Sequence, residues 1–415
     1  MSRTIIDVHV LQTVPPSNLN RDDTGTPKTA VYGGVRRARV SSQAWKRATR
    51  RAFEDLLDPD ELGFRTRRVA ELLAERITAA EASLDGGKAL ELAAETLHAA
   101  TGSKIEVPRR KAETAKRNGD PEPPPESSYL MFLSSRQFDG LARLAVEGAA
   151  DIKAFLKAKE NKEKARRIAD TRHSVDIALF GRMVADSADF NVEAAAQVAH
   201  AISVHQVENE SDYYTAVDDK NEKEEESGAG MIGTVDFNSA TLYRYAALDV
   251  DRLRDNLGDG RRSDQPPHEP VRRAVSAFLR GFIASMPTGK INTFGNHTLP
   301  EAVIVTLRSA RPISFVAAFE EPVLTPLGSG GHLRGACAQL LAHISDIEKA
   351  YEVTGDPSWV LRAGTATEPL LALGTEVTIG GLLDAVGDAV TARLTDRTPQ
   401  ATDQPHPPQN QDRPA

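Results

Sequence analysis

The stretch AVYGGVRRARVSSQAWKRATRRAF, residues 30–53, carries the chain from a glycine pair into the start of a helix. Ser41 or Ser42 is a typical helix N-cap, because a hydroxyl can accept a hydrogen bond from a free N–H of the first turn. The apolar stripe of this helix is predicted to consist of Trp45, Ala48, Ala52, Phe53 and Leu56. On or beside its opposite face lie Gln43, Lys46, Arg47, Arg50 and Arg51. One side of a single helix therefore gathers basic residues just after a Gly-Gly loop.

These basic residues belong to an asymmetric charge distribution. Residues 1–51 hold ten Lys and Arg against three acids, which is a net charge of +7; the whole chain of 415 residues is −8, so the remainder is −15. Salt screens charges beyond about 8–10 Å, so the local charge matters more than the total. The asymmetry predicts a local anion-binding surface on an otherwise acidic protein.

Composition excludes several classes of protein. The one cysteine, Cys337, rules out a disulfide framework and a cysteine-based metal site, and such low usage fits a reducing cytoplasm. No run of about 18 apolar residues suggests a membrane span, and residues 4–14 lack the unbroken apolar stretch of a signal peptide. We therefore expect a soluble, cytoplasmic protein.

Periodicity along the chain predicts an α+β fold. Strands are expected at 4–14, 174–180, 242–250 and 302–307. Helices are expected after residue 41 and at 66–84, 88–101, 135–170, 191–205, 268–286, 329–354 and 380–395. Residues 129–133 fit either a short strand or a helix start. Without the excursions, the order is strand, helix, strand, strand, helix, strand, which matches a ferredoxin-like or RNA-recognition-motif (RRM) sheet.

Signals for catalysis are weak. Asp22 and Asp23 could together hold a magnesium ion and cleave RNA, but loop salt links and turn hydrogen bonds explain them better. The ten histidines are scattered, and neither a Walker loop nor a His-Glu-x-x-His motif occurs. We expect no enzymatic activity, no metal and no cofactor.

The basic segment is the stronger candidate site. Glycines allow close approach of a phosphate, a helix start offers N–H donors, and arginine forks match phosphate geometry. The predicted contacts are Lys28, Gly33, Gly34, Arg36, Arg37, Arg39, Ser41, Gln43, Lys46, Arg47 and Arg50. The alternative from these residues alone is a solvated basic helix face.

Several stretches together resemble the CasC family, the backbone subunits of type I-E CRISPR Cascade complexes. They are NRDD (20–23), AVYGGVRRARVSSQAWKR (30–47), VDIALFGRM (175–183), AHAI (199–202), HQV (205–207), YYTAVDD (213–219) and YRYA (243–246). The similarity extends from residue 1 to about 310, and is weaker beyond it. The Pro-rich stretch 106–128 and the Pro/Gln-rich tail look like additions to the family pattern.

The resemblance implies a hand-like fold. An RRM-like palm would be formed by residues 1–60, 174–310 and, as a C-terminal helical part, 311–397. Residues 61–173 would be a helical finger insertion with a linker at 106–128, residues about 184–235 a thumb loop, and 398–415 a disordered tail. Copies would stack head to tail along a CRISPR guide RNA (crRNA), an open assembly closed at its ends by other subunits.

The resemblance also implies a mechanism in antiviral defence. Residues 28–50 would hold guide phosphates, while Met183 and Tyr214 match wedges that flip a base out at regular intervals. The guide would then pair with target DNA, and Lys153, Lys157 and Lys159 fall where the finger could touch that DNA. Expected partners are crRNA, target DNA through the guide, other copies of the chain, and end-capping, large and small Cascade subunits. The alternative is an RNA-cleaving backbone subunit of type III kind that uses Asp22 or Asp23.

Overall fold

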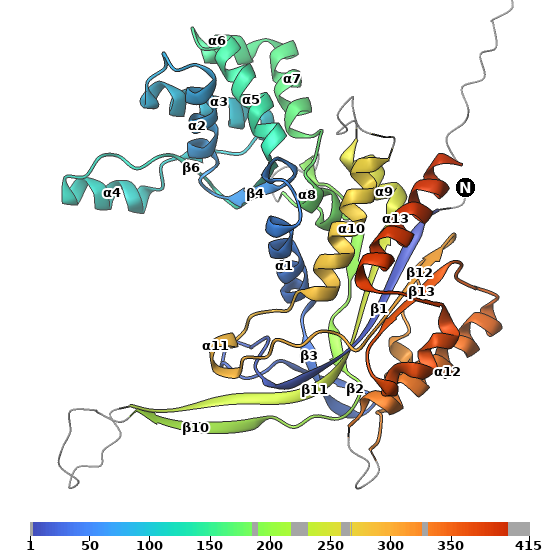
Figure 1. The fold of residues 1–415 in the computed structure, drawn as a ribbon. Helices are drawn as coiled ribbons and strands as arrows, with labels where there is room; N and C mark the ends of the chain where they lie inside the picture. The colour runs from blue at the N-terminus through green and yellow to red at the C-terminus, as the bar shows by residue number, and fades with distance from the viewer. Residues whose placement is uncertain are drawn as a thin grey trace, which may run out of the picture.

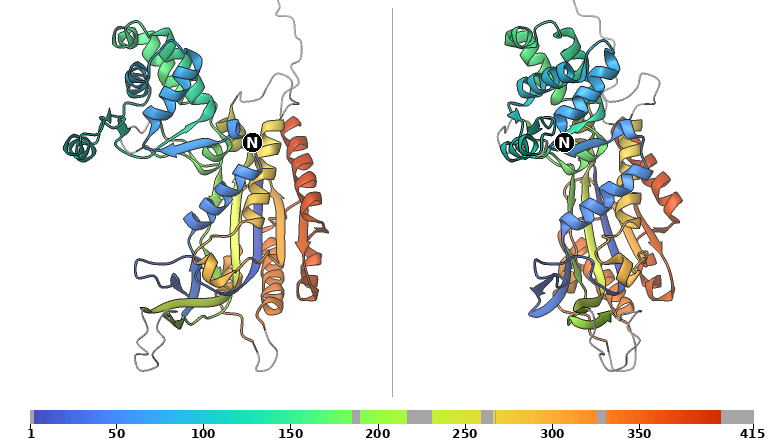
Figure 2. Two further views of the ribbon diagram at one scale, coloured as in Figure 1. Left: turned by 60° about the vertical axis from the view of Figure 1, so that its left-hand side comes forward. Right: turned by 90° about the vertical axis from the view of Figure 1, so that its left-hand side faces the viewer.

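The computed structural model describes residues 3–184, 190–216, 231–258, 266, 268–325 and 331–396. It shows a mixed helix and sheet fold in which one large sheet carries helices on both faces, and a separate group of helices stands at one end of it (Figures 1 and 2). No helix in these described ranges is long and apolar enough to cross a membrane.

The sheet is built around its N-terminal strand. β1 (Ile5–Ser17) pairs antiparallel with β11 (Met231–Asp249) on one side and β12 (Ala302–Arg308) on the other. The full order is β14-β13-β12-β1-β11-β9-β3-β2, and β8 and β10 also pair with β11. The remaining strands are β2 (Thr29–Tyr32), β3 (Val35–Val40), β8 (Ala196–Val198), β9 (Ala201–Ser203), β10 (Glu210–Ala216), β13 (Ser358–Arg362) and β14 (Thr375–Glu376). The predicted strands at 4–14, 242–250 and 302–307 are thus confirmed in position, the first two being longer than predicted.

Both faces of β1 are buried, which alternation alone did not reveal. Ile6, Val8 and Val10 face a helical layer with Phe278 and Phe282. This layer contains α1 (Ser42–Ala52), α9 (Val250–Leu257), α10 (Glu269–Ala284) and α13 (Ile379–Thr395). The opposite face is covered by α12 (Leu333–Tyr351) and the short helix η4 (Val316–Phe319). The helices predicted at 268–286, 329–354 and 380–395 are therefore confirmed.

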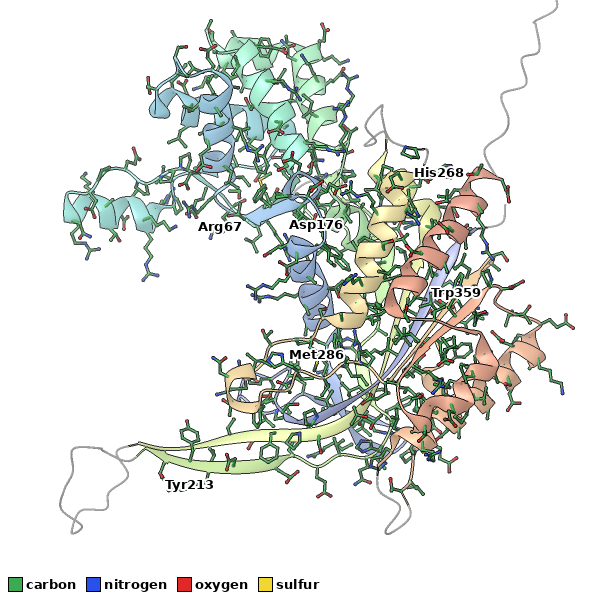
Figure 3. All side chains as sticks on the ribbon, in the orientation of Figure 1. Arg67, Asp176, Tyr213, His268, Met286 and Trp359 are labelled. Atoms are coloured by element: carbon green, nitrogen blue, oxygen red, sulfur yellow. The ribbon has the colours of Figure 1, made fainter. Side chains whose placement is uncertain are left out.

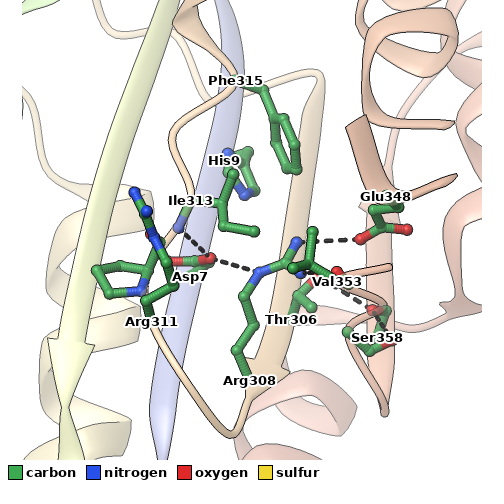
Figure 4. A network of polar contacts seen from close by, with 12 residues as sticks. Asp7, His9, Thr306, Arg308, Arg311, Ile313, Phe315, Glu348, Val353 and Ser358 are labelled. Carbon is green, nitrogen blue, oxygen red and sulfur yellow. Dashed lines mark hydrogen bonds and ion pairs between the residues drawn. The ribbon is translucent and has the colours of Figure 1, made fainter. Parts of the chain in front are cut away.

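Asp7 and His9 of β1 point toward α12 inside a polar network (Figure 4). The Asp7 carboxylate lies 2.7 Å from Nε of Arg308 and accepts a bond of 3.0 Å from the Ile313 N–H. Arg308 in turn lies 3.1 Å from Glu348 on α12. Since a buried charge is tolerated only when paired and hydrogen-bonded, these contacts account for an aspartate in the centre of the sheet.

A helical finger, which we define as α2 to α7 with β4 to β7, has a hydrophobic core of its own. Its main helices are α2 (Val69–Ala80), α3 (Gly86–Thr101), α5 (Ser135–Glu147), α6 (Ile152–Lys157) and α7 (Lys159–Ala169). β4 (Gly63–Thr66) pairs with β7 (Met131–Ser134) at its base. The predicted helices at 66–84 and 88–101 are confirmed, residues 129–133 include a strand, and 135–170 is three helices rather than one.

The solvated linker or insertion predicted at 106–128 contains the helix α4 (Arg109–Asn118), which forms between β5 (Ile105–Glu106) and β6 (Glu126–Ser127) and has no buried residue. Two other sequence predictions are wrong. Residues 174–180 form the short helix α8 (Val175–Phe180), which is buried almost all round, so its alternating apolar residues carried no strand signal. Residues 191–205 contain β8 and β9 rather than an Ala-rich helix, since pairing with β11 overrides helix propensity.

The remaining short elements are α11 (Ile291–Phe294), η1 (Phe53–Asp55), η2 (Pro59–Glu61) and η5 (Thr365–Leu373). β10 and the first half of β11 form a hairpin that projects to the same side as the finger, with α1 and α11 between them (Figure 1). Of the predicted thumb loop, 185–189 and 217–230 lie outside the described residues, as does the predicted tail 398–415.

Candidate nucleic-acid interface

The glycine pair forms the turn of the β2–β3 hairpin. Gly33 and Gly34 have φ of 60° and 75°, the left-handed values that a two-residue hairpin turn requires. A Cβ on Gly33 would lie 1.7 Å from the carbonyl oxygen of Glu320, so no larger residue fits there. Hairpin geometry and packing therefore account for Gly33 without any phosphate.

Arg37 is fully buried and bonds main-chain oxygens. Its guanidinium donates to the carbonyls of Tyr32, Ser203, Phe319 and Glu320 at 2.8–3.2 Å. Burial lowers the pKa of Arg37. This arginine ties the hairpin to the sheet and to η4, so its guanidinium is not free to bind a phosphate.

Other predicted contacts around the hairpin are only partly available. Arg39 donates from Nε to the Thr29 carbonyl at 3.2 Å, and its Nη1 lies 3.3 Å from Nδ1 of His200. The Ser41 hydroxyl accepts from the Ala44 N–H at 3.3 Å, so it caps α1 as predicted. Arg36 is exposed and Lys28 is half-buried.

The exposed side of α1 lines an open groove of about 850 Å³, which we call the basic groove. The finger base and the segment after α8 form its other walls. Its α1 residues are Gln43, Lys46, Arg47, Arg50 and Arg51; the facing residues include Arg65, Leu130, Phe132, Gly181, Arg182 and Met183. Desolvation lowers the pKa of Lys46. The structure thus joins Met183 to the basic helix face, from which it is separated by more than 130 positions in the sequence.

Arg50 has a structural partner inside the groove. Its Nε lies 2.9 Å from the buried Asp176 carboxylate, its Nη2 donates to the Gly63 carbonyl at 3.1 Å, and it stacks 4.6 Å from the Phe132 ring centroid. Asp176 also accepts from the N–H of Gly63 and the hydroxyl of Ser174. Figure 3 shows Asp176 where α1 meets the finger. Sequence reasoning missed this residue, because the segment 174–180 was predicted to be a strand and α8 makes Asp176 a buried helix residue.

Neither proposed wedge is buried. The Met183 side chain is 87% exposed at the groove, whereas Tyr214 is 45% exposed on β10. The Tyr214 ring covers Gly233, its partner across the hairpin. Its neighbour Tyr213 is 60% exposed on the opposite side of the strand and is labelled in Figure 3. The tyrosines do not line the basic groove of their own chain.

The finger lysines lie away from the basic groove. Lys153 is 3.4 Å from Glu95, and Lys159 is 3.8 Å from Glu163. Lys157 is exposed at the end of α6. Two of these three charges are therefore partly neutralised within the finger.

Asp22 and Asp23 lie in one loop, and the carboxylate of Asp22 accepts hydrogen bonds from that loop. The Asp22 carboxylate accepts from the hydroxyl and N–H of Thr24 and from the N–H of Thr26, at 2.7–3.0 Å, and the Thr24 hydroxyl is the main cause that lowers the pKa of Asp22. Asp23 is exposed. In the described ranges, no group of three or more His, Cys, Asp or Glu could hold a metal ion.

Comparisons with known proteins identify relatives of this chain. A solved chain described as "CRISPR RNA-guided surveillance complex, pre-nicking" is 34% identical, with a TM-score of 0.77, and the match covers 93% of this chain and 100% of that one. Another, described as "CRISPR RNA-guided surveillance complex", is 29% identical, with a TM-score of 0.67, covering 93% and 99%. No curated protein matches. A family model described as CT1975-like protein matches residues 6–385; this chain therefore belongs to the CT1975-like protein family.

Proposed function

We propose that this chain is the crRNA-binding backbone subunit of a type I-E Cascade complex, and that the basic groove holds the guide. The observation that carries the proposal is the groove itself, which brings Lys46, Arg47 and Arg51 together with the exposed Met183. The similarity to chains of CRISPR RNA-guided surveillance complexes supports it.

The sheet supports an RRM-like palm. The four strands β12-β1-β11-β9 are neighbours in the sheet. Along the chain, α1 comes between β1 and β9, α10 comes between β11 and β12, and both helices pack on one face. This is the strand order that a β-α-β-β-α-β ferredoxin-like unit adopts. The second strand is β9, not the segment 174–180 that the sequence suggested.

The groove binds RNA without reading its sequence. Its cations sit on one helix face, so they neutralise successive phosphates and release counterions, an effect indifferent to base identity. Met183 stands beside them as an apolar wedge against a base. Tyr214, on the projecting hairpin, wedges the strand held by a neighbouring copy in a head-to-tail filament, and stacking on an aromatic ring is worth about 1–3 kcal/mol per base.

The remaining partners follow from that filament. Other Cascade subunits cap its ends and flank it, and bases left free between wedges pair with target DNA. Specificity then comes from base pairing, while the protein supplies charge and shape. The proposal contains no catalytic step, and the engagement of Asp22 in its own loop supports this.

The test replaces two groove cations that have no ion-pair partner in the described ranges. Lys46→Ala with Arg47→Ala removes two phosphate contacts, which should flatten the slope of log affinity for single-stranded RNA against log salt by about 1.4. A matched control removes two exposed cations of α12, on the face of the sheet opposite α1, Arg334→Ala with Lys349→Ala. An equal loss in both variants, or no loss in either, would refute the assignment of the groove.

A cleavage assay separates this function from an RNA-cleaving one. Assembled complex is incubated with complementary RNA and magnesium, and the RNA should remain intact. Cuts at a regular interval that disappear in Asp23→Ala would instead establish an enzyme.

A further inference from the structure

Helix α4 stands away from the body of the finger (Figure 1). None of its residues is buried, and it begins after Pro108 and ends at Gly119, whose φ is 73°. The two-residue ladder between β5 and β6 and the ion pair of Lys111 with Glu126 connect it to the rest of the finger. Hydrophobic packing of the core therefore does not account for this helix.

The outer face of α4 is basic. Because successive residues turn by about 100°, Arg109, Arg110, Lys116 and Arg117 fall within an arc of about 120°. Within the described part of the chain none of these four has an ion-pair partner, and all four are exposed. Glu113 lies in the same arc and leaves this face a net charge of +3.

The inner face of α4 differs in character. Ala112 and Ala115 are half-buried there, on the same side as Lys111. The outer face consequently has no exposed apolar or aromatic side chain. Protein interfaces are anchored by such side chains, and single-stranded nucleic acids are held by stacking on aromatic rings. A surface with arginine forks and no such anchor suits the phosphates of a duplex.

We propose that α4 is a second nucleic-acid contact, separate from the basic groove, that binds the phosphate backbone of duplex DNA. Arg109, Arg110, Lys116 and Arg117 make the contacts, and the Pro-rich run 121–125 keeps the helix at a distance from the finger core as a semi-rigid spacer. The face has no base-reading or stacking group, so the binding is indifferent to sequence. The inference does not rest on the proposed function, since no residue of α4 lines the basic groove.

The experiment compares two variants of the full chain with equal loss of charge. The arm variant carries Arg109→Gln, Arg110→Gln, Lys116→Gln and Arg117→Gln; the control carries Arg280→Gln, Arg311→Gln, Arg334→Gln and Lys349→Gln, all at exposed positions elsewhere. Binding of a 20-bp DNA duplex and of a 20-nucleotide RNA is titrated against salt. For the duplex, the arm variant should flatten the slope of log affinity against log salt by about 3.6. Its RNA slope should equal that of the control.

A second variant is expected to bind the duplex more tightly, so its result cannot be explained by a fold that has been damaged. Glu113→Gln removes the one acid of the outer face and should tighten duplex binding by about 2–5-fold. A 20-residue polyglutamate peptide serves as the acidic protein probe. Unchanged duplex binding in the arm variant, an equal loss in the control, or a loss confined to polyglutamate would each overturn the proposal.

Discussion

Acid should destabilise the sheet through two buried histidines, His9 and His205. Nδ1 of His205 donates to the Gln206 carbonyl at 2.7 Å, and Nε2 accepts from the Thr241 N–H at 3.1 Å, so the neutral ring satisfies both nitrogens. Its ring stacks 3.7 Å from that of His332. Burial lowers the pKa of His205 to about 4 and that of His9 to about 3.

The sign follows from proton binding. Since both pKa values lie below the unfolded value of 6.5, the unfolded chain binds more protons, and folding stability falls as the pH drops from 6.5 toward 4. At pH 5 each histidine should cost about 2 kcal/mol relative to pH 8, or about 4 kcal/mol together. A loss of that size is a large fraction of the about 5–15 kcal/mol that holds a typical domain folded.

Tryptophan fluorescence can follow this effect, because both tryptophans are buried in this part of the fold: Trp45 lies in α1 and Trp359 lies in β13. Urea unfolding of the wild type and of His205→Gln would be measured from pH 5 to pH 8. Below pH 6 the variant should take up about one proton fewer than the wild type on unfolding. The slope of its unfolding free energy against pH should therefore be shallower by about 1.4 kcal/mol per pH unit. An identical slope in both proteins, or a wild-type stability that does not change between pH 7 and pH 5, would refute the reasoning.

Three further predictions concern particular residues. Asp176→Ala leaves the Arg50 guanidinium and the half-buried Gly63 N–H without their acceptor, so it should cost about 1–3 kcal/mol in urea unfolding, whereas an exposed control such as Asp23→Ala should be neutral. Gly33→Ala should displace the β2–β3 hairpin from the main chain at Glu320, because its Cβ collides with that carbonyl, and should lower the thermal unfolding temperature more than Gly34→Ala, which meets no atom within 4 Å and should cost only about 1 kcal/mol. Tyr214→Ala should leave assembly on RNA intact but remove regular kinks from the bound strand; a structure of the variant complex with normal kinks would exclude Tyr214 from the mechanism.

The sequence by itself determined the elements whose signal is local. β1, β12 and the helices α10, α12 and α13 follow from strong periodicity, and the Ser41 cap and the basic face of α1 follow from residue type and spacing. Local patterns misled where burial is complete on all sides or where pairing outweighs propensity, as in α8 and in β8 and β9.

Only the tertiary structure decided which basic residues are available. Arg37 and Arg50 look like their exposed neighbours in the sequence, yet one is enclosed by carbonyl oxygens and the other is bound to Asp176. The groove unites α1 with Met183 because the finger is inserted between them in the chain and folds back against both. Charge can be read residue by residue, but its access to a phosphate depends on contacts between segments far apart in sequence, and those form only in the folded chain.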